Sequence, residues 1–313
     1  MIETVNLTKK YGDLTALNNL NLTIEEGDCY GFIGPNGAGK TTTIKILATL
    51  LKPTWGEARV AGKVIGYQNR EIRPLIGYVP DFMGAYEDMV VQEYLEFFAA
   101  AYNINGKQRK QVVGDVLELT DLSYKHDAEV NSLSRGMQQR LSVARVLLHD
   151  PRVLLMDEPA SGLDPRARVE IRELLKELSR MGKTILISSH ILHELAELCN
   201  VVGVIEQGEL IFSGTVEEIM ARARVGRIIN IKVESRSKEA AELLSKVPGV
   251  SKIVLGQEND GVVIRCTIDD EKGLPVSDLP NRLITAGFRI TQLAEEKINL
   301  ETAFMRLTRG LVQ

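Results

Sequence analysis

The chain has 313 residues, which is long for one domain and ordinary for two. Hydrophobic residues make up 44% and charged residues 26%, as in soluble globular proteins, and the net charge of −4 argues against a chain that coats nucleic acid or an anionic membrane. No run approaches the ~20 apolar residues of a membrane span, and residues 1–4 do not resemble a signal peptide. The cysteines follow no metal-ligand spacing, which favours a reducing cytosol and core or surface thiols: Cys29, Cys199 and Cys266.

The N-terminal part of the chain predicts mainly strands. Residues 1–24 alternate between apolar and polar around turns, which is typical of an antiparallel sheet. Residues 29–33 are an apolar run suited to a buried strand, and residues 42–48 follow as a helix that Pro53 stops. Further strands are expected over residues 56–62 and 76–80.

A helical insertion is expected near residues 86–148, followed by alternating strands and helices. The helices of the insertion are expected over 91–102, over 107–120, and from Ser134 to before Asp150. Unbroken apolar runs at 153–156 and 184–188 are typical of central parallel strands buried on both faces. Helices are expected over 166–181 and 191–199, and a closing hairpin over 201–205 and 209–212. This alternation predicts a mostly parallel α/β core.

A basic, glycine-containing bridge at residues 221–227 marks a change in composition. Beyond it the pattern predicts the order β-α-β-β-α-β and a last helix, with strands at 228–233, 251–255, 262–268 and 288–294 and helices at 238–246, 276–286 and 300–308. This order is similar to a small α+β ferredoxin-like module. We therefore expect a domain over 1–220 and a regulatory or interaction domain over 221–313.

The stretch from Gly34 to Thr41 fits G-x-x-x-x-G-K-[ST], the phosphate-binding loop, between a predicted strand and a predicted helix. Glycines let backbone N–H groups face an anion, and the helix N-terminus adds positive potential. Lys40 is expected to reach the β- and γ-phosphates, and the Thr41 hydroxyl to ligate Mg²⁺. The alternative is a glycine-rich turn with a fortuitous Lys-Thr. The strand–turn–helix context favours a nucleotide site.

Two carboxylates and a histidine follow predicted buried strands. Asp157 and Glu158 end the strand at 153–156, at the edge where a parallel sheet binds ligands. Asp157 is expected to hold Mg²⁺, directly or through water, and Glu158 to polarise the attacking water as general base. His190 follows the next strand and can reach the γ-phosphate. The alternatives are an acidic loop and a structural histidine.

The sequence Leu-Ser-Arg-Gly-Met-Gln-Gln-Arg at residues 133–140 resembles the signature of the ATP-binding cassette (ABC) family, Leu-Ser-Gly-Gly-Gln followed by Gln-Arg. The resemblance covers residues 1 to about 220 and implies a P-loop NTPase core with an antiparallel β subdomain. It also implies ATP hydrolysis in a head-to-tail dimer, or in a pair with a second ATPase subunit, with two ATP molecules between the subunits. The residues then expected to bind ATP are Tyr11, stacked on adenine, with Gly34, Pro35, Asn36, Gly37, Ala38, Gly39, Lys40, Thr41 and Thr42. The implied contacts with the partner are a signature loop that touches the partner's ATP, Ser134, Arg135, Gly136 and Met137, and a dimer-contact loop, Ser161, Gly162, Leu163 and Asp164.

Two departures from the family pattern involve three residues. Asp81 stands where the family usually has Gln after a Tyr-Val-Pro strand. An acid binds Mg²⁺ or water with more charge but donates no amide hydrogen bond; the alternative is a plain turn residue. Arg135 and Met137 replace Gly and Gln of the signature, while Ser134 and Gly136 remain. Arg135 either places a cation near the ATP or faces solvent.

The resemblance implies a cytoplasmic ATPase subunit, peripheral on the membrane, that drives a permease encoded on another chain, with export favoured over import. A loop containing Asp81, Phe82, Met83 and Tyr86 is expected to receive a coupling helix of that permease; the alternative is that these side chains fill the core of the insertion. A second hypothesis is a soluble ABC ATPase acting on ribosomes or DNA, although the acidic balance offers no nucleic-acid surface. A third is a nucleotide-gated interaction protein without transport.

Overall fold

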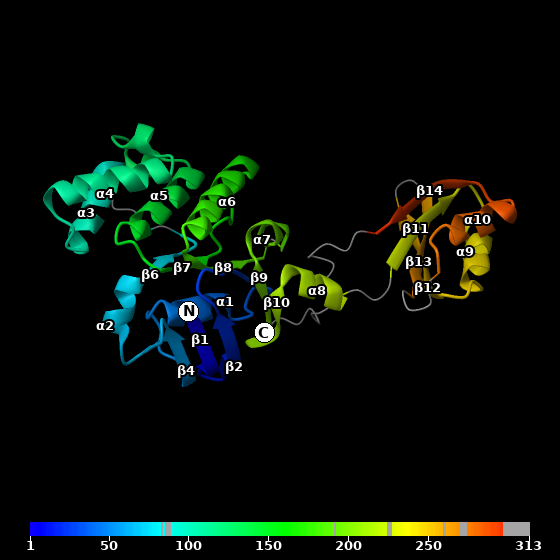
Figure 1. The fold of residues 1–313 in the computed structure, drawn as a ribbon, viewed down its shortest axis with the longest axis horizontal. Helices are drawn as coiled ribbons and strands as arrows, with labels where there is room; N and C mark the ends of the chain where they lie inside the picture. The colour runs from blue at the N-terminus through cyan, green and yellow to red at the C-terminus, as the bar shows by residue number, and fades with distance from the viewer. Residues whose placement is uncertain are drawn as a thin grey trace. The chain divides into compact units, whose positions relative to one another are not determined.

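The computed structural model describes residues 1–82, 84, 89–190, 192–223, 227–258, 261–269 and 274–296, without the side chains of 192–194, 221–223 and 258. The chain divides into two compact units, Met1–Ile219 and Met220–Arg306 (Figure 1). Among the helices of this described part, none has both the length and the apolar character that a membrane crossing requires.

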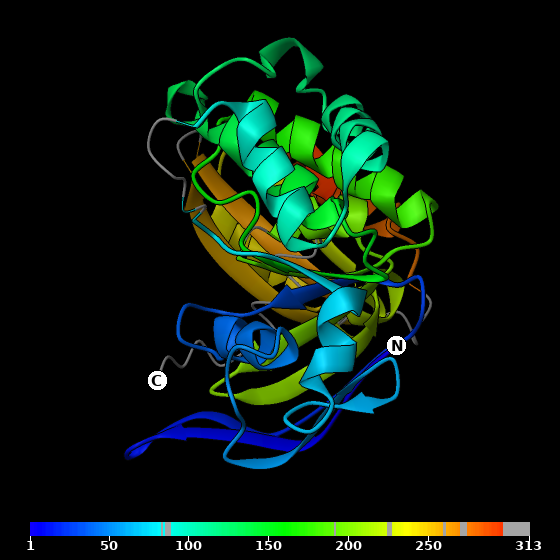
Figure 2. The ribbon, with the colours of Figure 1, turned by 90° about the vertical axis from the view of Figure 1, so that its left-hand side faces the viewer.

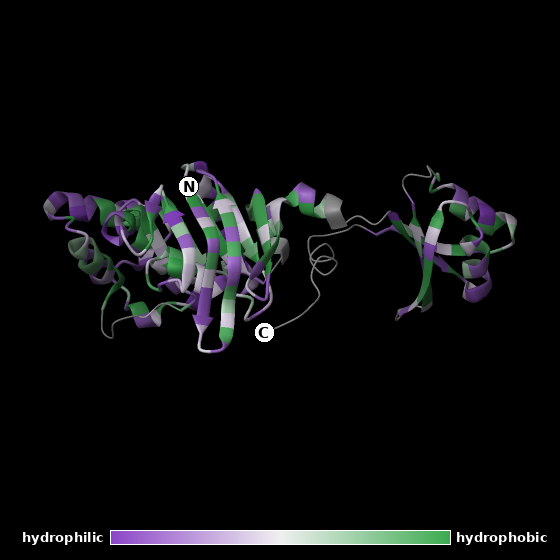
Figure 3. Cartoon of the chain, turned by 90° about the horizontal axis from the view of Figure 1, so that it is seen from below, coloured by the Kyte–Doolittle hydropathy of each residue, from purple (hydrophilic) through white to green (hydrophobic). Residues whose placement is uncertain are grey.

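The first unit begins with the antiparallel sheet that the alternation predicted. Strands β1 (Ile2–Tyr11), β2 (Leu14–Ile24), β4 (Trp55–Val60) and β5 (Lys63–Val64) pair in the order β2-β1-β4-β5. Polar and apolar residues alternate along these strands (Figure 3). The inward side chains, such as Leu7, Leu20 and Val60, are fully buried in a core shared with the second sheet.

The second sheet of this unit is mostly parallel, as predicted. Its order is β10-β9-β3-β8-β7-β6, and only the β9–β10 pairing is antiparallel. Every residue of its central strands β3, β7 and β8 is buried, which explains their unbroken apolar runs. The bounds are β3 (Cys29–Ile33), β6 (Ile76–Val79), β7 (Val153–Asp157), β8 (Thr184–Ser189), β9 (Val201–Glu206) and β10 (Glu209–Thr215).

Helices cover both faces of this parallel sheet (Figures 1 and 2). One side carries α1 (Lys40–Leu47) and the antiparallel sheet, and the other carries α3 (Val91–Ala101), α4 (Gly106–Leu119), α5 (Arg135–Leu147) and α6 (Pro165–Arg180). The unit also contains the short helices α2 (Asn69–Ile72) and α7 (Leu192–Leu198), and α8 (Val216–Ala223) spans the boundary between the two units. The predicted helical insertion is confirmed by α3, α4 and α5, and Tyr94 and Leu95 of α3 are buried as its amphipathic pattern requires.

The second unit is a four-stranded antiparallel sheet in the order β12-β13-β11-β14, with α9 and α10 supplying buried side chains to its core. Its elements follow the predicted chain order. The bounds are β11 (Arg227–Val233), α9 (Ser237–Ser245), β12 (Val250–Glu258), β13 (Gly261–Ile268), α10 (Asp278–Thr285) and β14 (Ile290–Glu295).

Several predicted boundaries were wrong by a few residues, and one helix was not predicted. Helix α8, which the pattern did not predict, extends to Ala223 in the segment predicted as a bridge; its buried Ile219 and the two glutamates in its first turn favour the helix. The last strand begins after Phe288, because Gly287 ends α10 with a left-handed φ of 82° and the Phe288 N–H donates to Leu283 O at 2.9 Å. The helix predicted at 300–308 lies outside the described residues, as do Met83 and Tyr86.

Candidate functional site

A pocket of about 530 Å³ lies where the loop after β3 meets the ends of β7 and β8. The carboxyl ends of parallel strands are where open α/β sheets bind ligands. The pocket is lined by residues from both sheets and from the loops between them: Tyr11, Leu14, Ala16, Asn36, Gly37, Gly39, Lys40, Thr41, Thr42, Asp81, Glu158, Ser161 and His190. Most of these are residues that the sequence predicted to bind ATP or to act on it.

The loop from Gly34 to Gly39 packs so closely that two of its glycines have no room for a side chain. A Cβ on Gly34 would lie 2.4 Å from the backbone oxygen of Ile205, and one on Gly39 would lie 2.7 Å from Ala16 O. Gly39 also has a left-handed φ of 107° and forms the N-cap of α1. The loop therefore leads directly into a helix N-terminus, which favours an anion.

The Lys40 ammonium is almost fully buried against this loop. It donates to Gly34 O at 2.7 Å and to Pro35 O at 3.1 Å, and it lies 3.5 Å from Glu158 Oε1. Only 5% of the residue is exposed. A buried cation of this kind needs nearby oxygen atoms, and the loop carbonyls and Glu158 supply them.

The Asp157 carboxylate is held by two hydroxyl groups. Thr41 Oγ1 donates to Asp157 Oδ1 at 3.0 Å, and Ser188 Oγ donates to the same oxygen at 2.7 Å. Ser188 Oγ also accepts from the Glu158 N–H at 3.0 Å. The sequence did not single out Ser188; its place at the end of β8, beside the end of β7, is the signal that identifies it.

Glu158 connects the lysine to the histidine. Its Oε2 lies 2.6 Å from His190 Nδ1, and its Oε1 faces Lys40. Its backbone φ of 51° is left-handed, which is uncommon for a residue with a side chain. The carboxylate therefore lies between a cation and an imidazole at the pocket wall.

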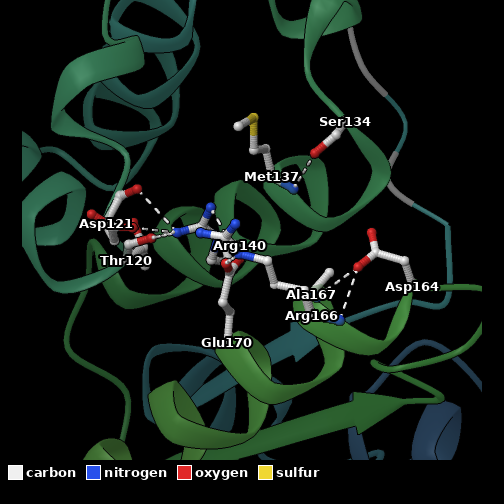
Figure 4. A network of polar contacts seen from close by, with 9 residues as sticks. All are labelled: Thr120, Asp121, Ser134, Met137, Arg140, Asp164, Arg166, Ala167 and Glu170. Carbon is white, nitrogen blue, oxygen red and sulfur yellow. Dashed lines mark hydrogen bonds and ion pairs between the residues drawn. The ribbon is translucent and has the colours of Figure 1, made fainter.

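The signature residues lie on α5 and do not line this pocket. Ser134 is the N-cap of α5, and its Oγ accepts from the Met137 N–H at 3.3 Å (Figure 4), which confirms the predicted helix start. A Cβ on Gly136 would lie 2.6 Å from Ala167 Cβ, so this glycine lets α5 approach α6 closely. Lower on α5, the buried Arg140 contacts Thr120, Asp121 and Glu170.

The loop from Ser161 to Asp164 begins at the pocket and ends at the N-terminus of α6. Ser161 lines the pocket, Leu163 is buried, and Asp164 is the N-cap of α6, where its Oδ1 accepts from the N–H groups of Arg166 and Ala167 at 3.0 Å. Figure 4 shows this cap near the start of α5.

Asp81 follows β6 and lines the pocket. Its Oδ1 lies 4.0 Å from Arg135 Nη2. Burial raises the pKa of Tyr78, a residue of β6, to about 12, and the negative charges of Asp157 and Asp81 act in the same direction. The carboxylates of Asp157 and Asp81 are therefore both close enough to Tyr78 to disfavour a negative charge on its hydroxyl group.

The pocket also contains residues that the sequence did not single out. Leu14 and Ala16, from β2, lie beside Tyr11 on the pocket wall. Tyr11 is 47% exposed, with Lys9 Nζ 5.0 Å from the centre of its ring. The other predicted loop residues do not line the pocket: Gly34 and Ala38 are buried, and Pro35 is half-buried.

Comparison with known proteins agrees with this geometry. A family profile described as ABC transporter matches residues 17–161. The Nod factor export ATP-binding protein I of Burkholderia lata is 35% identical over 303 residues, which cover 97% of this chain and 95% of that protein. The chain belongs to the ABC transporter family. The linearmycin resistance ATP-binding protein LnrL of Bacillus subtilis is 29% identical, with 98% of each chain covered.

Solved structures share the fold of the first unit. A structure described as the ATP binding subunit of an ABC transporter has a TM-score of 0.64 at 27% identity and covers 71% of this chain and 92% of that one. A dimeric ATP-binding cassette in a post-hydrolysis state, bound to ADP and Pi, has a TM-score of 0.62 at 28% identity and covers 69% of this chain and 98% of that one. The resemblance to an ABC transporter ATP-binding protein of the exporter type is confirmed, and the protein is an ATPase subunit of such a transporter. The relatives favour transport over the alternative of a soluble ATPase on ribosomes or DNA.

Proposed function

We propose that the pocket residues of this chain carry out the ATP hydrolysis of the family in the roles expected from the sequence. Lys40 and the backbone N–H groups of Gly34 and of residues 36–42 bind the phosphates, and Tyr11 stacks on the adenine. Glu158 acts as general base, and His190 orients it or contacts the γ-phosphate. The observation that supports these roles is the contact of Glu158 with both Lys40 and His190 at the pocket wall.

The oxygen atoms at the end of β7 fit a magnesium ion. Within the described part of the chain, no group of three or more His, Cys, Asp or Glu could hold a metal. Mg²⁺ is usually bound by one or two carboxylates, hydroxyls or waters together with the phosphates, so a sparse protein site suits it. Thr41, Asp157 and Asp81 would hold the ion, which neutralises phosphate charge when bound.

Two copies of the chain, or this chain and a second ATPase subunit, would pair head to tail with ATP between them. Ser134, Arg135, Gly136 and Met137 would then contact the partner's ATP, and the loop from Ser161 to Asp164 would lie along the dimer contact. The N-cap of α5 supports this proposal, because it places N–H groups at a helix start outside the chain's own pocket.

The subunit would act at the cytoplasmic face of the membrane by driving a permease on another chain. The named relatives serve Nod factor export and linearmycin resistance, which supports export here. Phe82 supports a docking loop, because 79% of this aromatic side chain is exposed beside the pocket residue Asp81. No nucleic acid is expected as a partner.

The second unit would be a ferredoxin-like accessory domain over residues 221–313, joined to an ATP-binding domain over residues 1–220. Its β-α-β-β-α-β order and the strand order β12-β13-β11-β14 support this assignment. We assign it a regulatory or interaction role, because its sequence has too few candidate catalytic residues for a second enzyme.

The catalytic roles are tested by steady-state ATPase assays on single variants. Lys40→Ala and Glu158→Gln should each lower hydrolysis by at least ~10²-fold, the scale of losing one charge-stabilising or proton-transfer group. Lys45→Ala is the matched control, because Lys45 lies on the same helix with its side chain exposed. Equal activity of Lys40→Ala and Lys45→Ala would contradict the assignment.

The permease is tested by purifying the tagged protein from detergent-solubilised membranes of its host. A multi-span protein should co-purify with the wild type and be lost from Phe82→Ala. Tyr67→Ala is the control, since Tyr67 is 91% exposed and lies outside the proposed docking loop. Co-purification of only ribosomal or DNA-associated proteins would overturn the transport role.

A further inference from the structure

Two of the residues that depart from the family pattern lie beside each other. Arg135 is the first residue of α5, and its Nη2 lies 4.0 Å from Asp81 Oδ1 at the end of the β6 loop. No other ion pair is recorded for either side chain among the described residues. Each is about half exposed, so both can move without breaking the core.

The charge of Arg135 is unfavourable where it stands on the helix. A helix N-terminus carries partial positive charge, so a cation at the first position is disfavoured and a nearby anion offsets it. Asp81 is that anion. The guanidinium also lies over Gly162, where an added Cβ would be 2.5 Å from Arg135 Nη1. One side chain therefore contacts the loop after β6 and the loop that precedes α6.

The two partners belong to different functional surfaces. Asp81 lines the chain's own pocket, together with Glu158 and His190. Arg135 lies next to Ser134, in the loop proposed to contact the partner's nucleotide, and it does not line that pocket. The pair thus connects the two surfaces within one subunit.

We propose that Arg135 is a positioning residue that holds the Asp81 carboxylate and is released when a divalent cation binds with ATP in the chain's own pocket. This proposal rests on the nucleotide site proposed above. The guanidinium and the metal compete for one carboxylate. The coupling is reciprocal: if the bound metal weakens the Arg135–Asp81 ion pair by a given factor, breaking that ion pair raises the metal affinity by the same factor. Metal and ATP bound in the chain's own pocket thereby leave the Arg135 side chain free to move in the loop that is proposed to contact the partner's nucleotide.

The proposal is tested by titrating Mn²⁺ into the full-length protein saturated with a non-hydrolysable ATP analogue, with free Mn²⁺ followed by electron paramagnetic resonance. Arg135→Gln should raise Mn²⁺ affinity roughly two- to fivefold, the scale of an exposed ion pair. The same substitution in the Asp81→Asn background should have no effect, and Arg135→Lys should keep the wild-type affinity. Arg180→Gln is the charge-matched control, since Arg180 pairs with the neighbouring Glu177 on the surface of α6.

A second variant moves the guanidinium without removing a charge. Gly162→Ala should displace Arg135 and raise Mn²⁺ affinity in the same direction as Arg135→Gln. Gly182→Ala is the control: Gly182 has a left-handed φ of 82°, similar to the 65° of Gly162, but no atom lies within 4 Å of the added Cβ. This substitution should leave the Mn²⁺ affinity unchanged. Thermal unfolding of each variant verifies that it is folded.

The outcomes separate the two proposals. An equal effect of Arg135→Gln with and without Asp81→Asn would overturn the Arg135–Asp81 pair while leaving ATP hydrolysis intact. Failure of the wild type to bind the analogue would overturn the nucleotide site itself. If Arg180→Gln raised the Mn²⁺ affinity as much as Arg135→Gln, the effect would come from the net charge of the protein, and the role of the Arg135–Asp81 pair would be overturned.

Discussion

Arg140 is expected to hold the helical region of the first unit onto its core. Its buried Nη1 donates to Thr120 O at 3.1 Å and to Asp121 O at 3.0 Å, the carbonyls of the C-cap of α4 and of the residue that follows it (Figure 4). Arg140→Met removes the guanidinium but keeps most of the apolar stem. Two hydrogen bonds from a charged donor, at about 1.5 kcal/mol each, give about 3 kcal/mol of lost stability. The ion pair with Asp121 adds little, because that acid is 83% exposed.

A loss of this size should lower the unfolding midpoint of the first unit by roughly 10 °C, which differential scanning calorimetry measures directly. Arg166→Met is the matched control: its guanidinium pairs with the same Glu170 at 3.1 Å but is 91% exposed, so its midpoint should change by about 1 °C. The burial argument would be refuted if the two variants shifted the midpoint equally. A large shift in Arg166→Met alone would assign the stability to Glu170 instead.

Three further predictions concern other buried groups. Burial lowers the pKa of His149 from its usual 6.5, so below pH 6.5 the unfolded chain binds a proton that the folded chain does not bind. The stability of the wild type should therefore fall below pH 6.5 relative to His149→Gln in thermal melts, and parallel pH profiles of the two proteins would contradict this. Gly34→Ala should weaken ATP binding at least tenfold, by the clash with Ile205 O, whereas Gly114→Ala, with open space around it, should not. All cysteines are buried, and burial raises the pKa of the Cys266 thiol to about 11, so thiol reagents at pH 8 should label them only after unfolding.

Much of the fold followed from local patterns. The strand at Cys29–Ile33 was predicted at its observed bounds, because an unbroken apolar run flanked by turns fits only a strand buried on both faces. Ser134 was predicted to start α5, because a serine before an apolar periodic segment favours an N-cap. Ends of elements were less certain. Phe288 has the apolar character of a strand residue, but its N–H completes the cap of α10, a hydrogen bond that alternation does not encode.

For the candidate site too, some features were predictable from the sequence and others depended on the tertiary structure. The sequence by itself determined the residue types of the pocket, because a phosphate loop and paired carboxylates after a buried strand are short-range signals. Only the tertiary structure decided that Ser188 bridges Asp157 and the Glu158 N–H, and that Asp81 lies beside Arg135. The members of these contacts lie 30 or more residues apart in the chain. They meet because the sheet order places β6, β7 and β8 side by side with α5 packed against β6, and packing over such separations is set by the whole core.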